Sequence, residues 1–299
     1  MKVTKLDTPI VLHDDSHVKL TEMGNITEIM YSDKRSYGGY ITKIDKDYYI
    51  DNRTGEFKEI KHIDNRSQDV SNVAKSLKSL RDIINTNVVD VSCCRWLTLT
   101  YADNMTDTNK LMRDFDNFNR RCRKIFGHYE YITASEPQAR GAWHLHVLLI
   151  FNGTAPFMAN DVVRKCWKQG FVNVRKLDNV DNVGAYLTAY LGDMELSEAI
   201  ENNLDTQSLK EVETTDDNGI KQTKRYVKGA RLYMYPAGFH IYRCSKGIKK
   251  PTVSRVSYKK AKEKVSSAKL TFSKTVVLED QVKDFKNTIS YEYYSKLRK

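Results

Sequence analysis

The fold is decided by one stretch, Trp143-His144-Leu145-His146-Val147-Leu148-Leu149-Ile150-Phe151, which is apolar apart from its two histidines. It contains no Gly or Pro, and this composition predicts a buried β-strand. Successive side chains of a strand point to opposite faces, so His144 and His146 share one face while Leu145 and Val147 point into a core. Taken alone, the two imidazoles fit either half of a metal site or polar positions on a half-exposed strand.

The segments around this strand predict the fold class. Their apolar spacing and turn residues indicate the order β-α-β-β-α-β-α, with strands and helices over residues 94–101, 107–125, 128–135, 143–151, 157–168, 171–175 and 183–191. This order predicts an α+β fold with a ferredoxin-like, split βαβ antiparallel sheet and helices on one face.

The rest of the chain suggests a division into four parts. Residues 1–67 read as an N-terminal extension of unclear role, with short strands and turns. Residues 68–195 form the central domain and begin with a helix over 68–87. Residues 196–223 are acidic and polar, which is typical of a linker or loop. Residues 224–299 form a basic C-terminal segment, and its last part, 281–299, is expected to be helical.

Charge is distributed unevenly along the chain. Residues 221–299 hold 21 Lys and Arg against 5 Asp and Glu, whereas residues 1–220 hold 28 against 33. A basic segment suits a polyanion, and nucleic acid is favoured over anionic lipid because no hydrophobic anchor accompanies it. A solvated lysine-rich tail is the alternative.

Several classes of protein are disfavoured. We find no apolar run of membrane-spanning length and no signal-peptide core, so no membrane partner is expected. The five cysteines are odd in number and form no Cys-x-x-Cys pair, which favours a cytoplasmic protein over a disulfide framework or a zinc cluster. The phosphate-binding motif G-x-x-x-x-G-K-[ST] is also missing, so an ATP-driven motor is not indicated.

A carboxylate near the histidines completes a candidate metal site. Glu136 precedes His144 by eight residues, and a short hairpin through Gly141 would bring it beside the His-x-His strand. Two imidazoles and a carboxylate suit a divalent metal, Mg²⁺ or Mn²⁺, with positions left open for water and substrate. Gln138 is a competing third ligand, and an exposed turn carboxylate is the alternative for Glu136.

Two tyrosines are candidate nucleophiles. Tyr186 and Tyr190 stand four residues apart on the expected helix 183–191 and therefore share a face. They fit an aromatic stripe in a core, or two phenols that attack a phosphodiester. A phenol has a pKa of about 10, so it needs activation, for example by a metal beside the phosphate.

Three motifs together resemble the HUH endonucleases, most of all the two-tyrosine rolling-circle replication initiators (Rep proteins) of plasmids, integrative elements and small phages. They are Thr98-Leu99-Thr100-Tyr101, then Glu136 with Gly141 and His144-Leu145-His146, then Tyr186-Leu187-Thr188-Ala189-Tyr190. Trp167 with Gly170 also resembles the Trp-x-x-Gly segment of that family. The resemblance covers residues 75–195, and is fainter over Lys228–Leu232 and Ser245–Lys249.

The resemblance implies the HUH fold and a defined chemistry. His144, His146 and Glu136 would bind the metal. One tyrosine, with a slight preference for Tyr190, would nick single-stranded origin DNA and become linked to the 5′ phosphate, and Tyr186 would act in the second transfer. Many relatives carry a lysine three residues after a catalytic tyrosine, whereas this chain has Ala189 and Asp193 there.

Basic residues are the candidates for DNA binding. Arg164, Lys165, Lys168 or a C-terminal lysine would replace the missing lysine. The basic C-terminal segment adds a further set: Lys224, Arg225, Lys228, Arg231, Lys246, Lys249 and Lys250.

Partners and rival functions follow from the same motifs. A host helicase and a DNA polymerase are expected as partners, because no ATPase motif is present. The alternatives are a transposase or relaxase with the same chemistry, and a non-catalytic nucleic-acid-binding module on a split βαβ sheet.

Overall fold

The computed structural model describes residues 2–6, 10–34, 39–138, 140–177, 182–188, 191–201, 204–215, 221–282 and 284–298. The chain divides into two compact units. One is continuous and comprises residues 65–250, and the other combines residues 1–64 with 251–299. All strand pairs between the described strands are antiparallel, which confirms an α+β protein with antiparallel sheets.

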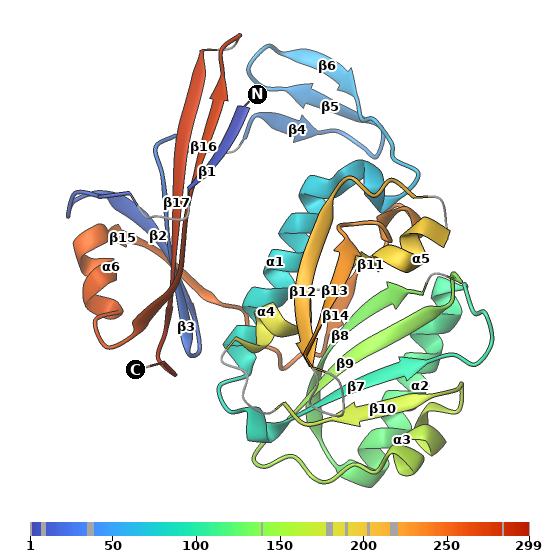
Figure 1. Ribbon diagram of the computed structural model, residues 1–299. Helices are drawn as coiled ribbons and strands as arrows, with labels where there is room; N and C mark the ends of the chain where they lie inside the picture. The colour runs from blue at the N-terminus through green and yellow to red at the C-terminus, as the bar shows by residue number, and fades with distance from the viewer. Residues whose placement is uncertain are drawn as a thin grey trace. The chain divides into compact units, whose positions relative to one another are not determined.

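The continuous unit is built on a five-stranded sheet of order β10-β7-β9-β8-β14 (Figure 1). The strands span Cys94–Thr100 (β7), Tyr129–Pro137 (β8), Trp143–Phe151 (β9), Val172–Arg175 (β10) and Tyr242–Cys244 (β14). The His-x-His strand β9 is central, with β7 on one side and β8 on the other. The sequence therefore predicted this strand and its buried face correctly.

Helices cover both faces of this sheet. Helices α2 (Thr108–Phe126) and α3 (Asn160–Trp167) pack on the face that carries Leu145 and Val147 of β9. Helices α1 (Val70–Asn87) and α4 (Val183–Thr188) pack on the other face, against Leu148. The expectation of helices on a single face was wrong, because β9 and its neighbours carry apolar side chains on both faces and each needs a cover.

The end of β7 is held against α3 by the Trp-x-x-Gly segment. The Trp167 indole N–H donates to the Thr100 carbonyl oxygen at 3.0 Å, and the Ala102 N–H donates to the Gln169 carbonyl oxygen at 2.8 Å. A Cβ atom on Gly170 would lie 2.5 Å from both Ala102 N and Thr100 O. The motif therefore has a packing role, because only glycine permits this approach of two backbones.

Helix α4 is fixed to α1 by an equally close contact. The Gly184 N–H donates to Asn85 Oδ1 at 2.8 Å. A Cβ on Gly184 would lie 2.4 Å from the Arg81 carbonyl oxygen. This contact sets the place of α4 over the face of the sheet that carries the histidines.

The segment expected to be a linker has secondary structure. Residues 196–215 include helix α5 (Leu196–Glu201) and strand β12 (Leu209–Thr215). Strand β12 pairs with β13 (Lys221–Val227), which also pairs with β11 (Met194–Glu195). Short 3₁₀ helices span Arg66–Asp69, Val91–Cys93 and Leu232–Met234. Alternating charged residues hid this hairpin, because its buried residues are few.

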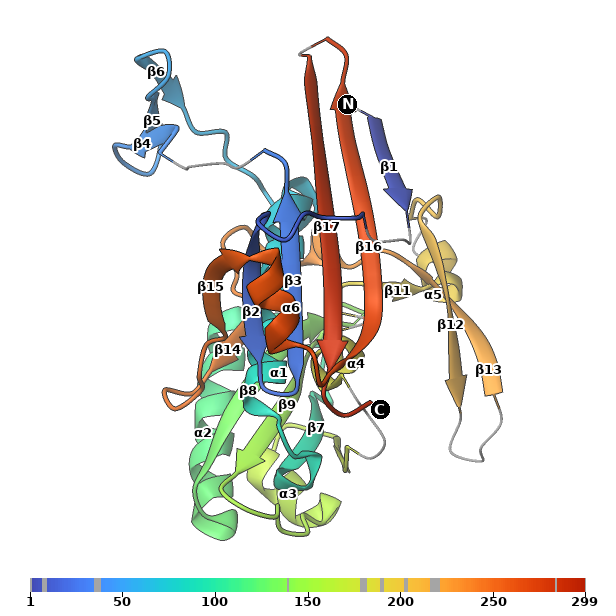
Figure 2. The ribbon, with the colours of Figure 1, turned by 90° about the vertical axis from the view of Figure 1, so that its left-hand side faces the viewer.

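The discontinuous unit is built from both ends of the chain. Its six-stranded sheet has the order β1-β16-β17-β3-β2-β15. The strands are Lys2–Leu6 (β1), His17–Met23 (β2), Ile26–Ser32 (β3), Thr252–Ser257 (β15), Lys269–Asp280 (β16) and Phe285–Ser295 (β17). Helix α6 (Tyr258–Lys264) lies on one face, where Ala261 and Val265 pack on Leu20 and Ile29 (Figure 2).

Two sequence expectations fail in this unit. The predicted terminal helix over 281–299 is strand β17, which lies between β16 and β3 and alternates buried and half-buried side chains. The basic segment 224–299 is also not one structural part, because it contributes to both units. Residues 41–59 add a small sheet of strands Ile41–Lys43 (β4), Tyr48–Asp51 (β5) and Glu56–Glu59 (β6).

Candidate metal centre

Strand register brings the three predicted metal ligands together. Glu136 of β8 lies directly opposite His144 of β9, and Ala134 lies opposite His146. The hairpin between the strands is closed by the Gln138 N–H, which donates to the Ala142 carbonyl oxygen at 2.8 Å. The small side chain at Ala134 leaves room for Glu136 to reach both imidazoles.

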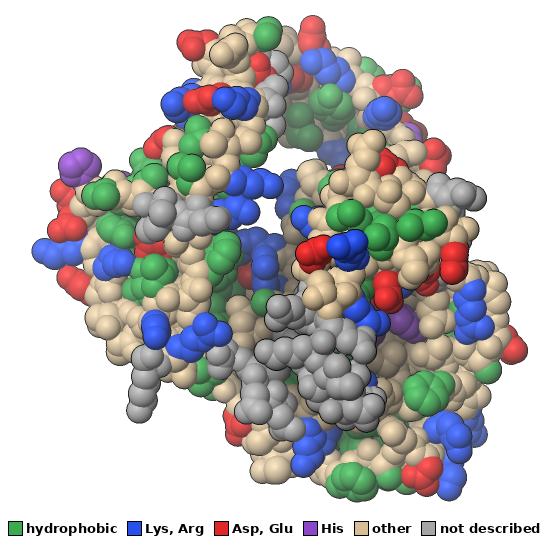
Figure 3. Space-filling view, in the orientation of Figure 1, with side chains coloured by type: hydrophobic (Ala, Val, Ile, Leu, Met, Phe, Trp, Pro, Cys, Tyr) green, Lys and Arg blue, Asp and Glu red, His purple; other side chains and the backbone are tan. Residues whose placement is uncertain are grey.

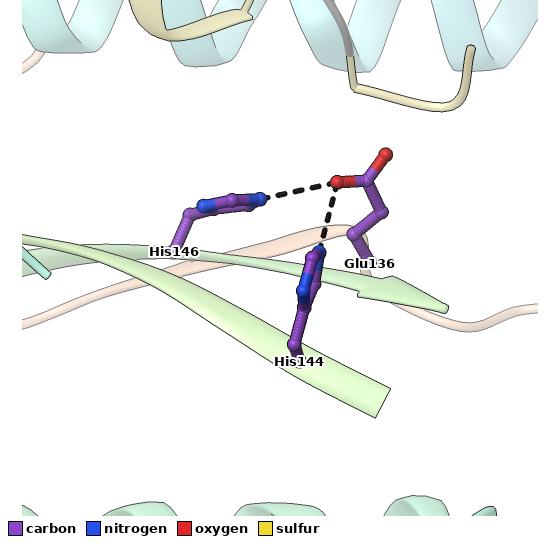
Figure 4. Close-up of side chains that lie close together, drawn as sticks. All are labelled: Glu136, His144 and His146. Atoms are coloured by element: carbon purple, nitrogen blue, oxygen red, sulfur yellow. Dashed lines mark hydrogen bonds and ion pairs between the residues drawn. The ribbon is translucent and has the colours of Figure 1, made fainter. Parts of the chain in front are cut away.

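The three side chains converge on one point (Figure 4). Nε2 of His144 and Nε2 of His146 each lie 3.1 Å from Oε2 of Glu136. The Glu136 side chain is 6% exposed and the histidines 14% and 18%, so the cluster is largely shielded from water. All three ligand atoms lie within 4.8 Å of one another.

The other oxygen of Glu136 is held by two further groups. Arg231 Nη1 lies 3.1 Å from Glu136 Oε1, and the Gly192 N–H donates to the same oxygen at 3.3 Å. Burial by itself would raise the pKa of Glu136. Hydrogen bonds from both histidines and the charge of Arg231 outweigh burial and hold this pKa well below its usual range. Glu136 is therefore a carboxylate with one oxygen left to face the imidazoles.

The two imidazoles are oriented by their surroundings. His146 stacks on Trp96 with ring centroids 5.4 Å apart and an angle of 5° between the planes. Its Nδ1 is buried and has no hydrogen-bond partner among the described residues. Burial lowers the pKa of His144 and outweighs the hydrogen bond to Glu136, which favours the neutral imidazole. A neutral imidazole is the form that ligates a metal.

This donor set fits a divalent cation. Six-coordinate Mg²⁺ binds oxygen at about 2.0–2.1 Å, which places neighbouring ligand atoms about 3 Å apart. The two Nε2–Oε2 distances of 3.1 Å match that spacing. Two imidazoles and one carboxylate oxygen would leave further coordination positions open. Glu136, His144 and His146 thus form a candidate metal site, and the geometry does not choose among metals.

The predicted tyrosines are only partly described. Tyr186 lies on α4, but its side chain is outside the described residues, as is the whole of Tyr190. The segment that follows them contacts the site, because Gly192 is a hydrogen-bond donor to Glu136. Asp193, where many relatives of the HUH class have lysine, accepts from the Gly229 N–H and lies 3.4 Å from Lys210 Nζ.

Gln138 is placed away from the ligand cluster. Its Oε1 accepts a hydrogen bond from Arg140 Nε at 3.2 Å, within the hairpin that joins β8 to β9. Glu136 is the residue that reaches both histidines.

The predicted DNA-binding residues of α3 lie on the opposite face of the sheet from the metal ligands. Arg164, Lys165 and Lys168 are exposed, and α3 packs on the Leu145 face. Figure 3 shows Lys and Arg side chains over the region of α2 and α3. These cations are available to a polyanion, but the structure does not bring them to the histidines.

The remaining predicted cations fall into two groups. Lys224 and Arg225 of β13 pair with Glu195 and Glu211, and Lys228 follows exposed. Lys246, Lys249 and Lys250 project from a loop that is tightly held to the sheet: the Ser245 hydroxyl and the Gly247 N–H donate to Glu130, and the Lys249 N–H donates to Asn87. The faint Ser245–Lys249 resemblance therefore marks an anchored basic loop.

Sequence reasoning missed the role of Arg231. Its place in the basic segment groups it with DNA-binding cations, yet its side chain is only 15% exposed and lies between Glu136 and Glu198. Burial disfavours its charge, but these two carboxylates outweigh burial and raise the pKa of Arg231. Nothing in the local sequence distinguishes Arg231 from Arg225, because the difference lies in partners far away along the chain.

Comparison with known proteins gives one match. Residues 94–195 match a family of replication-associated proteins, described as the ORF2 type. The matched region is about a third of the chain and contains the three metal-ligand candidates and both tyrosines. No curated protein and no solved structure matches the chain.

The match supports a protein class, that of proteins acting in the initiation of DNA replication. Such a role implies DNA binding. Among the helices that the structure describes, none is both long and apolar enough to cross a membrane.

Proposed function

We propose that this protein is an HUH-type replication initiator, a metal-dependent enzyme that nicks and rejoins single-stranded DNA at a rolling-circle origin. The observation that carries the proposal is the convergence of His144, His146 and Glu136 on one face of the sheet. Strand order supports it: with β7, β8, β9 and β10 numbered one to four, the order is four-one-three-two, which is that of a ferredoxin-like sheet. The family match favours replication over a transposase or relaxase with the same chemistry.

The protein's own residues prepare the site for a phosphodiester. Glu136 would present Oε2, and the histidines their Nε2 atoms, to a divalent metal. A bound metal would neutralise the scissile phosphate and favour the attacking phenolate. Arg231 and the Gly192 N–H hold the second carboxylate oxygen and so fix the direction of the first.

The proposed reaction is a transesterification. A tyrosine Oη bonds to the scissile phosphorus and the bond from phosphorus to the 3′ oxygen breaks. The phenolic proton leaves the tyrosine, and the departing 3′ oxygen takes up a proton. The products are a 5′-phosphotyrosine bond and a free 3′ hydroxyl, so the linkage energy is kept and rejoining needs no ATP. The 3′ hydroxyl would prime a host polymerase, with strand separation by a host helicase.

The tyrosines are proposed to act in sequence. Tyr190 would make the first nick and Tyr186 the second transfer. The chain runs from both tyrosines to Gly192, whose N–H contacts Glu136, which is consistent with phenols presented to the ligand face. A phenylalanine at either position keeps the ring and removes only the hydroxyl. Tyr190→Phe should therefore lose the covalent 5′ adduct, whereas Tyr186→Phe should keep the first nick and lose the second transfer.

The test is adduct formation on labelled single-stranded origin DNA with Mn²⁺ or Mg²⁺. His144→Ala and His146→Ala should abolish nicking, because each removes a metal ligand. His62→Ala is the matched control, since His62 is an exposed histidine paired with Asp47 in the other unit. Circular dichroism would show that all three variants are folded. Full activity of the double histidine variant would refute the metal site.

Two further outcomes discriminate between the rivals. Mass spectrometry of the DNA-linked peptide identifies the attached residue, and an adduct on Tyr186 alone would reverse the assignment of the tyrosines. DNA binding without any nicking or adduct by the wild-type protein would favour the non-catalytic binding module.

A further inference from the structure

The six-stranded sheet of the discontinuous unit has two unlike faces. Helix α6 is the only helix in the described part of this unit, and it covers the face formed by Val18, Leu20 and Ile29. The opposite face begins with the alternate residues of each strand, such as Lys19 of β2 and Met30 of β3. We call this second surface the open face.

Strand register aligns one row of side chains across five strands of the open face. Lys274 of β16 is opposite Tyr291 of β17, and Tyr291 is opposite Met30 of β3. Met30 is opposite Lys19 of β2, which is opposite Arg255 of β15. Strands lie about 4.8 Å apart, so this row extends over about 19 Å. We call it the basic row.

The open face combines cations with aromatic rings. Arg255 is exposed and Lys19 and Lys274 are half-buried. Phe272 is 50% exposed and contacts Tyr293 edge-on at 5.8 Å, one step along the strands from the basic row.

The surroundings of the row are also basic. A hollow over the Lys19 end is lined by His17, Ser32 and Lys34 together with Arg255. Two carboxylates lie on the strands of this face. Glu28 accepts a hydrogen bond from the Tyr293 hydroxyl, and Asp280 lies at the end of β16. Among the described residues, the positive charge of the open face therefore exceeds the negative charge on it.

We propose that the open face binds single-stranded DNA, with phosphates on the basic row and bases against Phe272 and its aromatic neighbours. Cations that follow the backbone and rings that accept any base are the two features of single-strand binding without sequence preference. The choice of DNA as the polyanion rests on the proposed function. The surface would hold the displaced or flanking strand while the other unit acts on the origin.

The test measures binding of the full-length protein to a fluorescent single-stranded oligonucleotide without the origin, over a series of salt concentrations. The row variant is Lys19→Gln with Arg255→Gln and Lys274→Gln. Each phosphate contact on a single strand contributes about 0.7 to the salt slope, so this variant should lower the slope by about 2. Phe272→Ala should weaken binding about tenfold with an unchanged slope, because it removes a stacking surface and no charge.

The control removes three other lysines of the same unit, Lys46, Lys259 and Lys260, by the same change to glutamine. All three are exposed and lie outside the open face. Matching unfolding curves would show that both triple variants are folded. If the row variant does not fold, Arg255→Gln alone, at an exposed position on the edge strand β15, should lower the slope by about 0.7.

Several results would overturn the inference. One is an unchanged slope in the row variant, or in Arg255→Gln where that replaces it, and another is an equal loss in the control. A loss seen on duplex DNA and not on the single strand would refute the choice of ligand. Nicking is read separately: a wild-type protein that forms no adduct while the row variant loses its slope would sink the proposed function and leave the open face standing. An active enzyme with an unchanged slope would do the reverse.

Discussion

Replacing Arg231 by glutamine should weaken divalent-metal binding and protein stability while leaving the salt dependence of DNA binding unchanged. Arg231 lies 3.1 Å from Glu136 and 2.8 Å from Glu198, and its side chain is 15% exposed. These contacts make it a positioning residue for the candidate metal centre. A phosphate-binding role, as its place in the basic segment predicts, would have the opposite signature.

The magnitude follows from what remains after the change. Glu136 is 6% exposed and would lose the one cationic side chain, apart from the histidines, that pairs with it among the described residues, while keeping the Gly192 N–H. Breaking a buried pair costs about 3–5 kcal/mol. The lower figure, about 3 kcal/mol, applies here because the remaining hydrogen bonds still stabilise the carboxylate. Loss of a group that orients a metal ligand weakens metal affinity by about 10–100-fold.

The matched control is Arg225→Gln. Arg225 pairs with Glu211, both side chains are 60% exposed, and such surface pairs contribute at most about 1 kcal/mol. Urea denaturation in EDTA gives the stability, and calorimetric titration with Mn²⁺ gives the metal affinity. The reasoning is refuted if Arg231→Gln matches Arg225→Gln in both quantities, or if its main effect is a shallower salt slope in DNA binding.

Two further predictions concern the frame of the site. Gly170→Ala should destabilise the continuous unit by about 1–3 kcal/mol in urea denaturation, because the added Cβ would lie 2.5 Å from backbone atoms of β7 and the residues after it, whereas Gly153→Ala meets nothing within 4 Å and controls for backbone strain. The pKa of Glu130 is held below its ordinary value of 4.5 by the Ser245 hydroxyl first, against burial, and by His128 and the Gly247 N–H. Its stabilising contribution is therefore present above the unfolded pKa and lost as pH falls through the lower folded pKa, so the stability difference between wild type and Glu130→Gln should shrink on acidification below 4.5, and a constant difference would contradict this.

Local patterns were enough to predict the centre of the fold. The nine-residue strand 143–151, the helix 107–125 and the hairpin through Gly141 depend on nearby residues, and the structure has each within a residue or two. The triad could be predicted for the same reason. Its members come from adjacent strands joined by a short turn, so the period of a strand fixes which side chains share a face.

Long-range pairing explains what the sequence did not reveal. Strand β17 was expected to be helical, although Tyr291, Tyr293 and the residues between them alternate as a strand does. Its partners are β16 and β3, and β3 lies more than 250 residues away in the chain. Neither the N-terminal nor the C-terminal segment contains a core of its own, so neither could be read as a domain alone.

Glu136 shows how the site depends on parts of the chain outside the matched family region. Its two oxygens contact groups from β9, from Gly192 after α4, and from Arg231 before the 3₁₀ turn at Leu232–Met234. The family match ends at residue 195, so Arg231 and its second partner Glu198 lie beyond it. The matched region would thus hold the ligands and both tyrosines, but a buried carboxylate needs a cation to fix its orientation, and this chain supplies that cation from the segment that follows. A fragment ending at residue 195 should therefore keep the triad in sequence and lose its geometry.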